Sequence, residues 1–264
     1  MPIWFWLFST ALFGLMLGSF ANVVIWRLPL EQSVVRPRSR CPKCSTLIAW
    51  YDNFPVFSWL WLRGRCRHCK APISVRYPLV ELLMSLLMTA VVWRFGLSWL
   101  TVEYLIFVFG LVIVSFIDLD HLILPDEFTL SGIVIGLVGA VLNPQRDFMP
   151  AFWGVLMGGG FLWAVAYVYL ALRKQEGMGG GDVKLLAWIG AVLGWQSIPF
   201  VILTSSLLGS VVGLAAARKS GLGMKASIPF GPYLALAAIL YIFGGSRLGA
   251  WYLEIFLPGL SGVN

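Results

Sequence analysis

The chain has 264 residues, of which 59% are hydrophobic and only 12% are charged. A soluble domain typically carries about 25% charged residues, so this composition excludes an ordinary globular domain with one buried core. The length is instead sufficient for several membrane spans of roughly 20 residues each. We therefore expect an all-α polytopic membrane protein.

Eight apolar segments are bounded by charged residues or by Pro and Gly, and each predicts a transmembrane helix. They cover approximately 3–26, 78–95, 99–117, 128–142, 151–172, 183–195, 197–217 and 229–246. The first segment is longer than the apolar part of a signal peptide and has no Lys or Arg before it, which predicts a retained helix. We divide the chain into a first transmembrane helix at 1–26, a cytoplasmic domain at 27–77 and a multi-helix membrane domain at 78–264.

Ten of the 19 Lys and Arg residues lie between positions 27 and 76, where Glu31 and Asp52 are the only acidic residues. Such a segment can indicate nucleic-acid binding, but in a membrane protein it is typical of a cytoplasmic loop. An N-terminus outside the membrane leaves only Arg94, Arg146 and Arg247 among the basic residues of the outer loops. The positive-inside rule then places both termini outside and 27–77, 118–127, 173–182 and 218–228 inside. We expect contact with the lipid bilayer and no nucleic-acid partner.

Several predicted spans carry glycines four residues apart, a spacing that lets helices approach closely in lipid. The pairs are Gly14/Gly18, Gly132/Gly136, Gly154/Gly158 and Gly209/Gly213. Asn22 extends the first of these faces, where we expect an interhelical hydrogen bond.

Four cysteines lie in the basic loop as two CxxC pairs that 21 residues separate: Cys41, Cys44, Cys66 and Cys69. This pattern supplies four thiolates to one tetrahedral zinc ion. Disulfides or redox use are the alternatives, but disulfides rarely persist in the cytoplasm. Four thiolates leave no open coordination position, so we predict a structural zinc, with His68 of the second pair outside the ligand set.

Acidic residues near a bilayer are costly and are functional candidates by default. Asp118 ends the third segment, Asp120 and Asp126 follow in the next inside loop, and Asp182 opens the sixth segment after Gly179-Gly180-Gly181. Structural explanations exist: Asp126 and Asp182 occupy positions suited to helix N-caps, and Asp120 suits a solvated loop. Asp118 has no comparable explanation because it directly abuts an apolar run.

Two close carboxyl groups that share a proton can activate a water and polarise a peptide carbonyl. A helix N-terminus at Asp182 favours charge there, so we expect Asp182 to be the base more often and Asp118 the acid. The chain has only two histidines and neither an HExxH nor a GxSxG motif. The residues alone leave two classes open, a membrane aspartyl protease and a proton- or cation-coupled transporter.

Several motifs resemble those of the bacterial prepilin peptidases, a GxGD family of aspartyl proteases. The matching segments are Gly18-Ser19-Phe20-Ala21-Asn22-Val23, the two CxxC pairs, Ser74-Val75-Arg76-Tyr77-Pro78-Leu79-Val80-Glu81, Asp118-Leu119-Asp120-His121 with Pro125-Asp126, and Gly179-Gly180-Gly181-Asp182-Val183-Lys184. The resemblance implies that Asp118 and Asp182 are catalytic. It also implies a supporting role for Gly179, Gly181, Lys184, Asp120 and Asp126.

The resemblance further implies a substrate and a location. The family cleaves the basic leader from type IV prepilin or pseudopilin precursors after a Gly, at the cytoplasmic face of the bacterial inner membrane. Many members also methylate the new N-terminal residue with S-adenosylmethionine. Glu81 is a candidate for the methylation site, although it could equally pair with Arg76 or with another donor at a helix end. A protease without methyltransferase activity is the alternative within the family.

Overall fold

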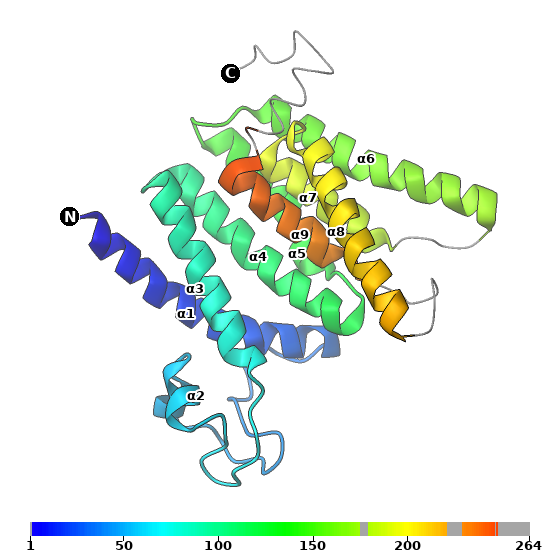
Figure 1. The fold of residues 1–264 in the computed structure, drawn as a ribbon. Coiled ribbons are helices and arrows are strands. Elements are labelled where there is room, and N and C mark those ends of the chain that lie inside the picture. Colours follow the sequence, from blue (N-terminus) through cyan, green and yellow to red (C-terminus); the bar gives the residue numbers. More distant parts are fainter. Residues whose placement is uncertain (1, 175–178, 221–228, 246, 248–264) are drawn as a thin grey trace. The chain divides into compact units, whose positions relative to one another are not determined.

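The computed structural model describes residues 2–174, 179–220, 229–245 and 247 (Figure 1). Within these residues the secondary structure is helical, with two isolated β-bridges and no strand, which confirms the expectation of a helical protein. Parts of the predicted inside loops 173–182 and 218–228 lie outside the described residues. The chain divides into two compact units, Met1–Ile113 and Val114–Asn264.

The first unit is built on the pairing of helix α1, Ile3–Arg27, with helix α3, Arg76–Phe95. A Cβ atom on Gly18 would lie only 2.6 Å from the Cα of Glu81, so the two backbones touch there. The Asn22 amide donates a hydrogen bond of 3.1 Å to the carbonyl of Tyr77. The expected glycine contact face and interhelical hydrogen bond are both confirmed.

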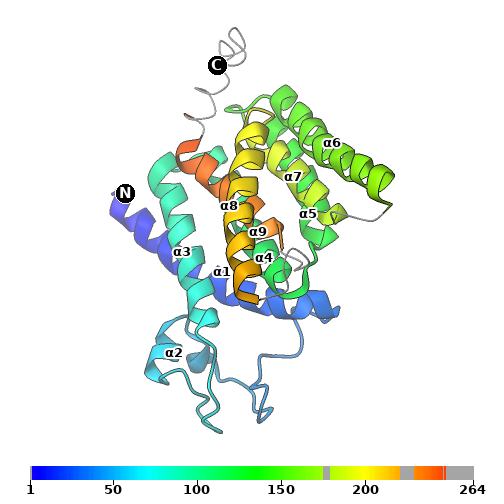
Figure 2. The same cartoon turned by 45° about the vertical axis from the view of Figure 1, so that its right-hand side comes forward.

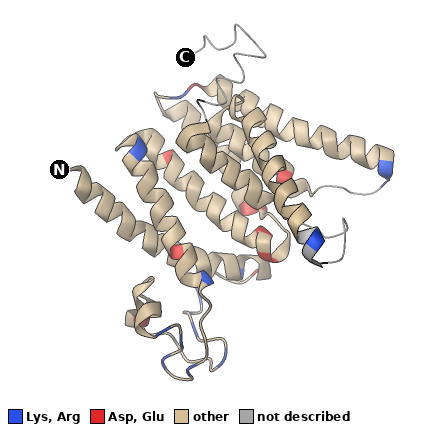
Figure 3. Ribbon diagram, viewed as in Figure 1, with Lys and Arg blue, Asp and Glu red and all other residues tan. Residues whose placement is uncertain are grey.

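The segment between α1 and α3 contains little regular structure. It includes the short helices η1, Leu28–Leu30, η2, Trp50–Asn53, and α2, Phe57–Trp61, and it also carries the four cysteines. Figure 3 shows Lys and Arg gathered along this loop. Turns and short hydrogen-bonded segments hold it together in place of an apolar core.

Helix α4, Trp99–His121, contains the boundary between the two units. In the first unit, Phe109 of α4 stacks on Phe20 of α1 with the ring centroids 6.5 Å apart. The last part of α4 belongs to the second unit and ends just after Asp118.

The second unit surrounds helix α7, Gly180–Leu193, with other helices (Figures 1 and 2). These are α5, Asp126–Leu142; α6, Phe148–Arg173; α8, Ser197–Ser220; and α9, Gly231–Leu240, which continues as the π-helix η4, Tyr241–Gly245. Eight consecutive residues of α7, Leu185–Val192, are buried. This helix is therefore the core of the unit.

Glycines make the close packing around α7 possible. The ring of Trp188 crosses α5 at Gly132, and α6 meets α7 where Gly154 faces Gly190. At the far end of α7, Arg146 donates a hydrogen bond of 2.6 Å to the carbonyl of Ala191. A cation at the C-terminus of a helix satisfies its free carbonyls and complements its dipole.

Five helical segments are long and apolar enough to cross a membrane: Ile3–Leu30, Arg76–Phe95, Trp99–His121, Phe148–Arg173 and Ser197–Ala215. The other three predicted segments also form helices, but α5 has 17 residues, α7 has 14 and α9 has ten. At 1.5 Å per residue α7 is about 21 Å long, which is less than the roughly 30 Å of a hydrocarbon core. Length and composition thus identify a multi-span membrane protein with five clear spans.

Candidate active site and cysteine cluster

Asp118 lies in the last turn of α4 and is only 5% exposed. Its Oδ2 accepts a hydrogen bond of 2.9 Å from the backbone N–H of Gly231, the first residue of α9. The free N–H groups and the dipole at a helix N-terminus both stabilise a negative charge. The carboxyl group of Asp118 therefore has a donor suited to its ionised form.

Asp182 lies in the first turn of α7, and its carboxyl group interacts electrostatically with that of Asp118. The structure thus brings together two aspartates that are 64 positions apart, one from the end of α4 and one from the start of α7. Asp182 is partly exposed, and its carboxyl group has no hydrogen-bond donor among the described residues. The two carboxyl groups therefore have different surroundings.

Leu124, in the loop between α4 and α5, connects the chain segments around the aspartates. A Cβ atom on Gly181 would lie 2.8 Å from the Cβ of Leu124, and one on Gly231 would lie 3.0 Å from its Cδ2 and 2.7 Å from Asp118 Oδ2. Both positions therefore need glycine for steric reasons. Among the described residues, no atom lies within 4 Å of such a Cβ at Gly179 or Gly180, so these residues impose no such restriction there.

Lys184 and Asp126 join the starts of α7 and α5. The Nζ of Lys184 lies 2.6 Å from Oδ1 of Asp126, and both side chains remain partly exposed. An exposed ion pair of this kind contributes little to stability. Neither Asp126 nor Asp182 is an N-cap, because Pro125 and Gly179 occupy those positions and make no side-chain cap bond.

Sequence reasoning missed Gly231 and Leu124. Gly231 stands in Phe230-Gly231-Pro232 at the start of the last apolar segment, and a Gly-Pro pair there is a visible helix-start signal. No pattern in the sequence indicates that the first residue of this helix would contact Asp118. Asp120 is exposed in the last turn of α4, two positions after Asp118.

The four cysteines form a second cluster, in the first unit. Their Sγ atoms all lie within 4.8 Å of one another, and those of Cys41 and Cys69 are 3.8 Å apart. A tetrahedron with Zn–S bonds of about 2.3 Å has S···S edges of about 3.8 Å. All four thiols are free of disulfides. The residues present therefore fit one zinc ion.

The two CxxC pairs have the same local structure. In each, a β-bridge forms beside the first cysteine, Arg40 with Leu47 and Arg65 with Pro72. In each, the residue after the second cysteine has a positive φ, 57° at Ser45 and 58° at Lys70. The repeated turn directs both thiols of a pair to the same point, which explains how a loop without a core can present four ligands.

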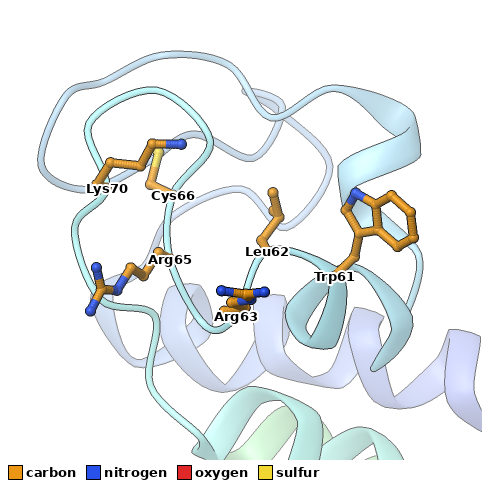
Figure 4. Close-up of a pocket in the computed structure, with 6 residues that line it drawn as sticks. All are labelled: Trp61, Leu62, Arg63, Arg65, Cys66 and Lys70. Atoms are coloured by element: carbon orange, nitrogen blue, oxygen red, sulfur yellow. The ribbon is translucent and has the colours of Figure 1, made fainter.

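A pocket of about 430 Å³ lies beside this cluster (Figure 4). It is lined by Trp61, Leu62, Arg63, Arg65, Cys66 and Lys70. The nearby carboxylate of Asp52 is already bound by Arg67, at 2.7 and 2.5 Å, and this hydrogen bonding lowers the pKa of Asp52. Four thiolates around Zn²⁺ leave a net negative charge, which the basic lining of the pocket would balance.

Glu81 is buried in α3 near its start, with 7% of its surface exposed. Its Oε2 accepts a hydrogen bond of 2.7 Å from the backbone N–H of Val56, and Ser19 of α1 also hydrogen-bonds to the carboxyl group. The carboxyl group of Glu81 is therefore hydrogen-bonded within the protein, both to the loop and to α1.

The fold and the site define a multi-span helical membrane protein in which α4 and α7 each supply one aspartate of an interacting pair and the start of α9 binds Asp118. Residues 105–214 match the model of the type IV leader peptidase family, and residues 12–95 match that of the bacterial peptidase A24 N-terminal domain. The chain belongs to the type IV leader peptidase family.

Several curated relatives share the name prepilin leader peptidase/N-methyltransferase. The chain is 41% identical to the protein of Aeromonas hydrophila, over 96% of both chains. It is 41% identical to that of Stutzerimonas stutzeri, over 91% of both chains, and 38% identical to that of Pseudomonas aeruginosa, over 93% of this chain and 92% of the relative. No solved structure matches the chain.

Proposed function

We propose that this protein is a membrane aspartyl endopeptidase that removes the basic leader from type IV prepilins or pseudopilins and methylates the new N-terminus. The observation that carries the proposal is the meeting of Asp118 and Asp182 in one site, within a chain of the leader peptidase family. Family membership does not favour the transporter hypothesis. Cleavage occurs after a Gly of the precursor, at the cytoplasmic face of the inner membrane.

In the proposed mechanism Asp118 is the base and Asp182 the acid. Asp118 takes a proton from a water molecule while the water oxygen attacks the scissile carbonyl carbon, and Asp182 gives its proton to the carbonyl oxygen. The resulting diol collapses when its C–N bond breaks, the leaving nitrogen receives the proton held by Asp118, and Asp182 takes back a proton from one diol hydroxyl, which leaves a carboxylic acid and restores both aspartates. This assignment reverses the expectation from sequence, because the N–H of Gly231 stabilises charge on Asp118.

Lys184, Asp126, Gly181 and Gly179 support this site in the proposal. The Lys184–Asp126 pair keeps the starts of α5 and α7 together, and Gly181 lets α7 approach Leu124. No described residue comes within 4 Å of a Cβ at Gly179, which suits a segment at which an extended substrate approaches Asp182. We assign Asp120 a lesser role at the edge of the site.

We propose that eight helices cross the membrane, with the N-terminus outside, and that the domains are 1–26, 27–77 and 78–264. The contacts around Asp118 support this topology. The end of α4, the start of α7 and the start of α9 lie together, so each intervening pair of helices returns to the same side. A pair of helices that starts and ends on one side crosses the membrane either twice or not at all. Since α6 and α8 are long enough to cross, we infer that their shorter partners α5 and α7 also cross.

Zinc is proposed as a structural ion held by Cys41, Cys44, Cys66 and Cys69. S-adenosylmethionine is the proposed methyl donor, and its bound form would supply an electrophilic methyl group to the new amino terminus. The relatives' name supports this second activity, and no residue of the chain is assigned to the donor.

Purified protein in detergent tests the proposal directly. Wild type is expected to shorten a prepilin by its leader and to add one methyl group, which mass spectrometry detects. Asp118→Asn and Asp182→Asn variants that still insert and bind zinc are expected to lose cleavage by at least about 10³-fold. Wild-type activity in either variant would remove that aspartate from the mechanism, and cleavage without methylation would leave a protease only.

A further inference from the structure

Val56, at the start of α2, has a backbone conformation that β-branched residues rarely adopt. Its φ is 62° and its ψ is −51°, and the N–H of Phe57 bonds the carbonyl of Pro55 at 2.6 Å. These features define a γ-turn of the strained, positive-φ kind. Such a turn persists only where its surroundings hold it in place.

Glu81 is what holds this turn. Its Oε2 accepts a hydrogen bond of 2.7 Å from the N–H of Val56, so α3 binds the backbone of the loop at a strained residue. The Glu81 side chain and backbone are themselves held by contacts with α1. Glu81 is buried, Ser19 bonds to its carboxyl group, and α1 touches its backbone at Gly18.

The turn at Val56 is also connected, through α2, to the segment that carries the second CxxC pair. Helix α2 begins directly after Val56, and Trp59 of α2 donates a hydrogen bond of 3.1 Å from its Nε1 to the carbonyl of Ile73. The same indole covers Gly64, whose carbonyl accepts the N–H of Ile73 at 2.7 Å. Gly64 and Ile73 flank the second CxxC pair on both sides. A continuous set of contacts thus runs from Glu81 to the zinc ligands.

We infer that Glu81 is a positioning residue, which fixes the four-cysteine domain on the α1/α3 pair through the strained turn at Val56. This role is an alternative to the part in methylation expected for Glu81 from sequence, and it accounts for the two protein donors that bind its carboxyl group. The inference rests on the proposed function, and its activity test further assumes that methyl transfer depends on the N-terminal unit. Cleavage depends on Asp118 and Asp182 in the other unit, so the two activities should respond differently.

The test compares both activities on one prepilin for wild type, Glu81→Ala and Glu81→Gln. Glu81→Ala is expected to lower methyl transfer at least about tenfold and cleavage less than about threefold, while a full complement of zinc remains. Glu81→Gln keeps an oxygen acceptor for the Val56 N–H and should retain most of the methylation. Equal loss of both activities in Glu81→Ala, or no loss of either, would overturn the inference.

A second substitution separates positioning from a general loss of structure. In Glu81→Ala, changing Val56→Gly removes the strain of the turn, since glycine adopts positive φ readily, and should restore methylation at least about threefold. Absence of any recovery would contradict the inference.

Hydrogen exchange supplies a readout that does not depend on methylation. Amides of residues 56–62 should exchange at least about tenfold faster in Glu81→Ala and return toward wild type in the double variant. Unchanged exchange overturns the role of Glu81, whereas wild type without methyl transfer would refute only that part of the proposed function.

Discussion

Gly231 shows how one residue without a side chain can position a proposed catalytic group. Its N–H binds Asp118, and a Cβ atom in its place would lie 2.7 Å from the same carboxyl oxygen. Gly231→Ala should push the carboxyl group out of position and lower kcat/KM of prepilin cleavage by about 10- to 100-fold, because displacement by about 1 Å can cost that much. A cleavage assay on variants of equal membrane yield measures the effect.

Gly244→Ala is the matched control, since a Cβ at Gly244, in the π-helix that continues α9, meets no atom of the described residues within 4 Å. We expect it to cleave at a rate close to that of wild type. If Gly231→Ala were as active as this control, the contact between α9 and Asp118 would have no part in catalysis.

The glycines before Asp182 offer a second comparison at the residue scale. Gly181→Ala places a methyl group against the Cβ of Leu124, which cannot swing aside as a side-chain end would, so the start of α7 must move. Gly180→Ala meets no atom within 4 Å. Cleavage by Gly181→Ala should fall about tenfold or more, and cleavage by Gly180→Ala should fall less than about twofold. If both substitutions lowered cleavage equally, the glycines would be needed for backbone flexibility and not for the close contact with Leu124.

At the scale of elements, the sequence was a good guide wherever a long apolar run stood between polar boundaries. Each of the eight runs forms a helix, and Gly18 and Asn22 make the contacts expected of them. The ends of helices were harder to predict, because packing decides where an apolar helix stops. Neither α2 nor the turn at Val56 was predicted, since both depend on Glu81, a residue that is distant in the sequence.

The cysteine domain should depend on its metal because it has almost no apolar core. Zinc binding to such a domain supplies folding free energy directly. Cys41→Ser should lose most of the bound zinc and make residues 28–75 sensitive to protease, while the helical content measured by circular dichroism stays near that of wild type.

His68→Ala is the control for this prediction, because His68 lies inside the second CxxC pair but is not among the residues that could hold the metal. It should retain one zinc per chain. Loss of zinc from His68→Ala would place the histidine in the ligand set and contradict a four-thiolate site.

At the scale of the whole molecule, the open question from sequence was how many of the apolar segments cross the membrane. Length alone selects five, because α5, α7 and α9 are short. The candidate site also bears on the number of spans, because Asp118, Asp182 and Gly231 lie at the ends of three different helices that meet there. Contacts of this kind add to what hydropathy says about sidedness, and of these three residues only Gly231 was not expected from the sequence.

Reporter fusions after residues 145 and 174 distinguish the two topologies. If eight helices cross, residue 145 is outside, where alkaline phosphatase is active, and residue 174 is inside, where only a cytoplasmic reporter is active. If only the five long helices cross, both results are reversed. The start of α7 would then lie across the membrane from the end of α4, and Asp182 could not interact with Asp118. We expect the eight-span pattern, because the three basic residues Arg173, Lys174 and Lys184 then lie inside, together with both aspartates.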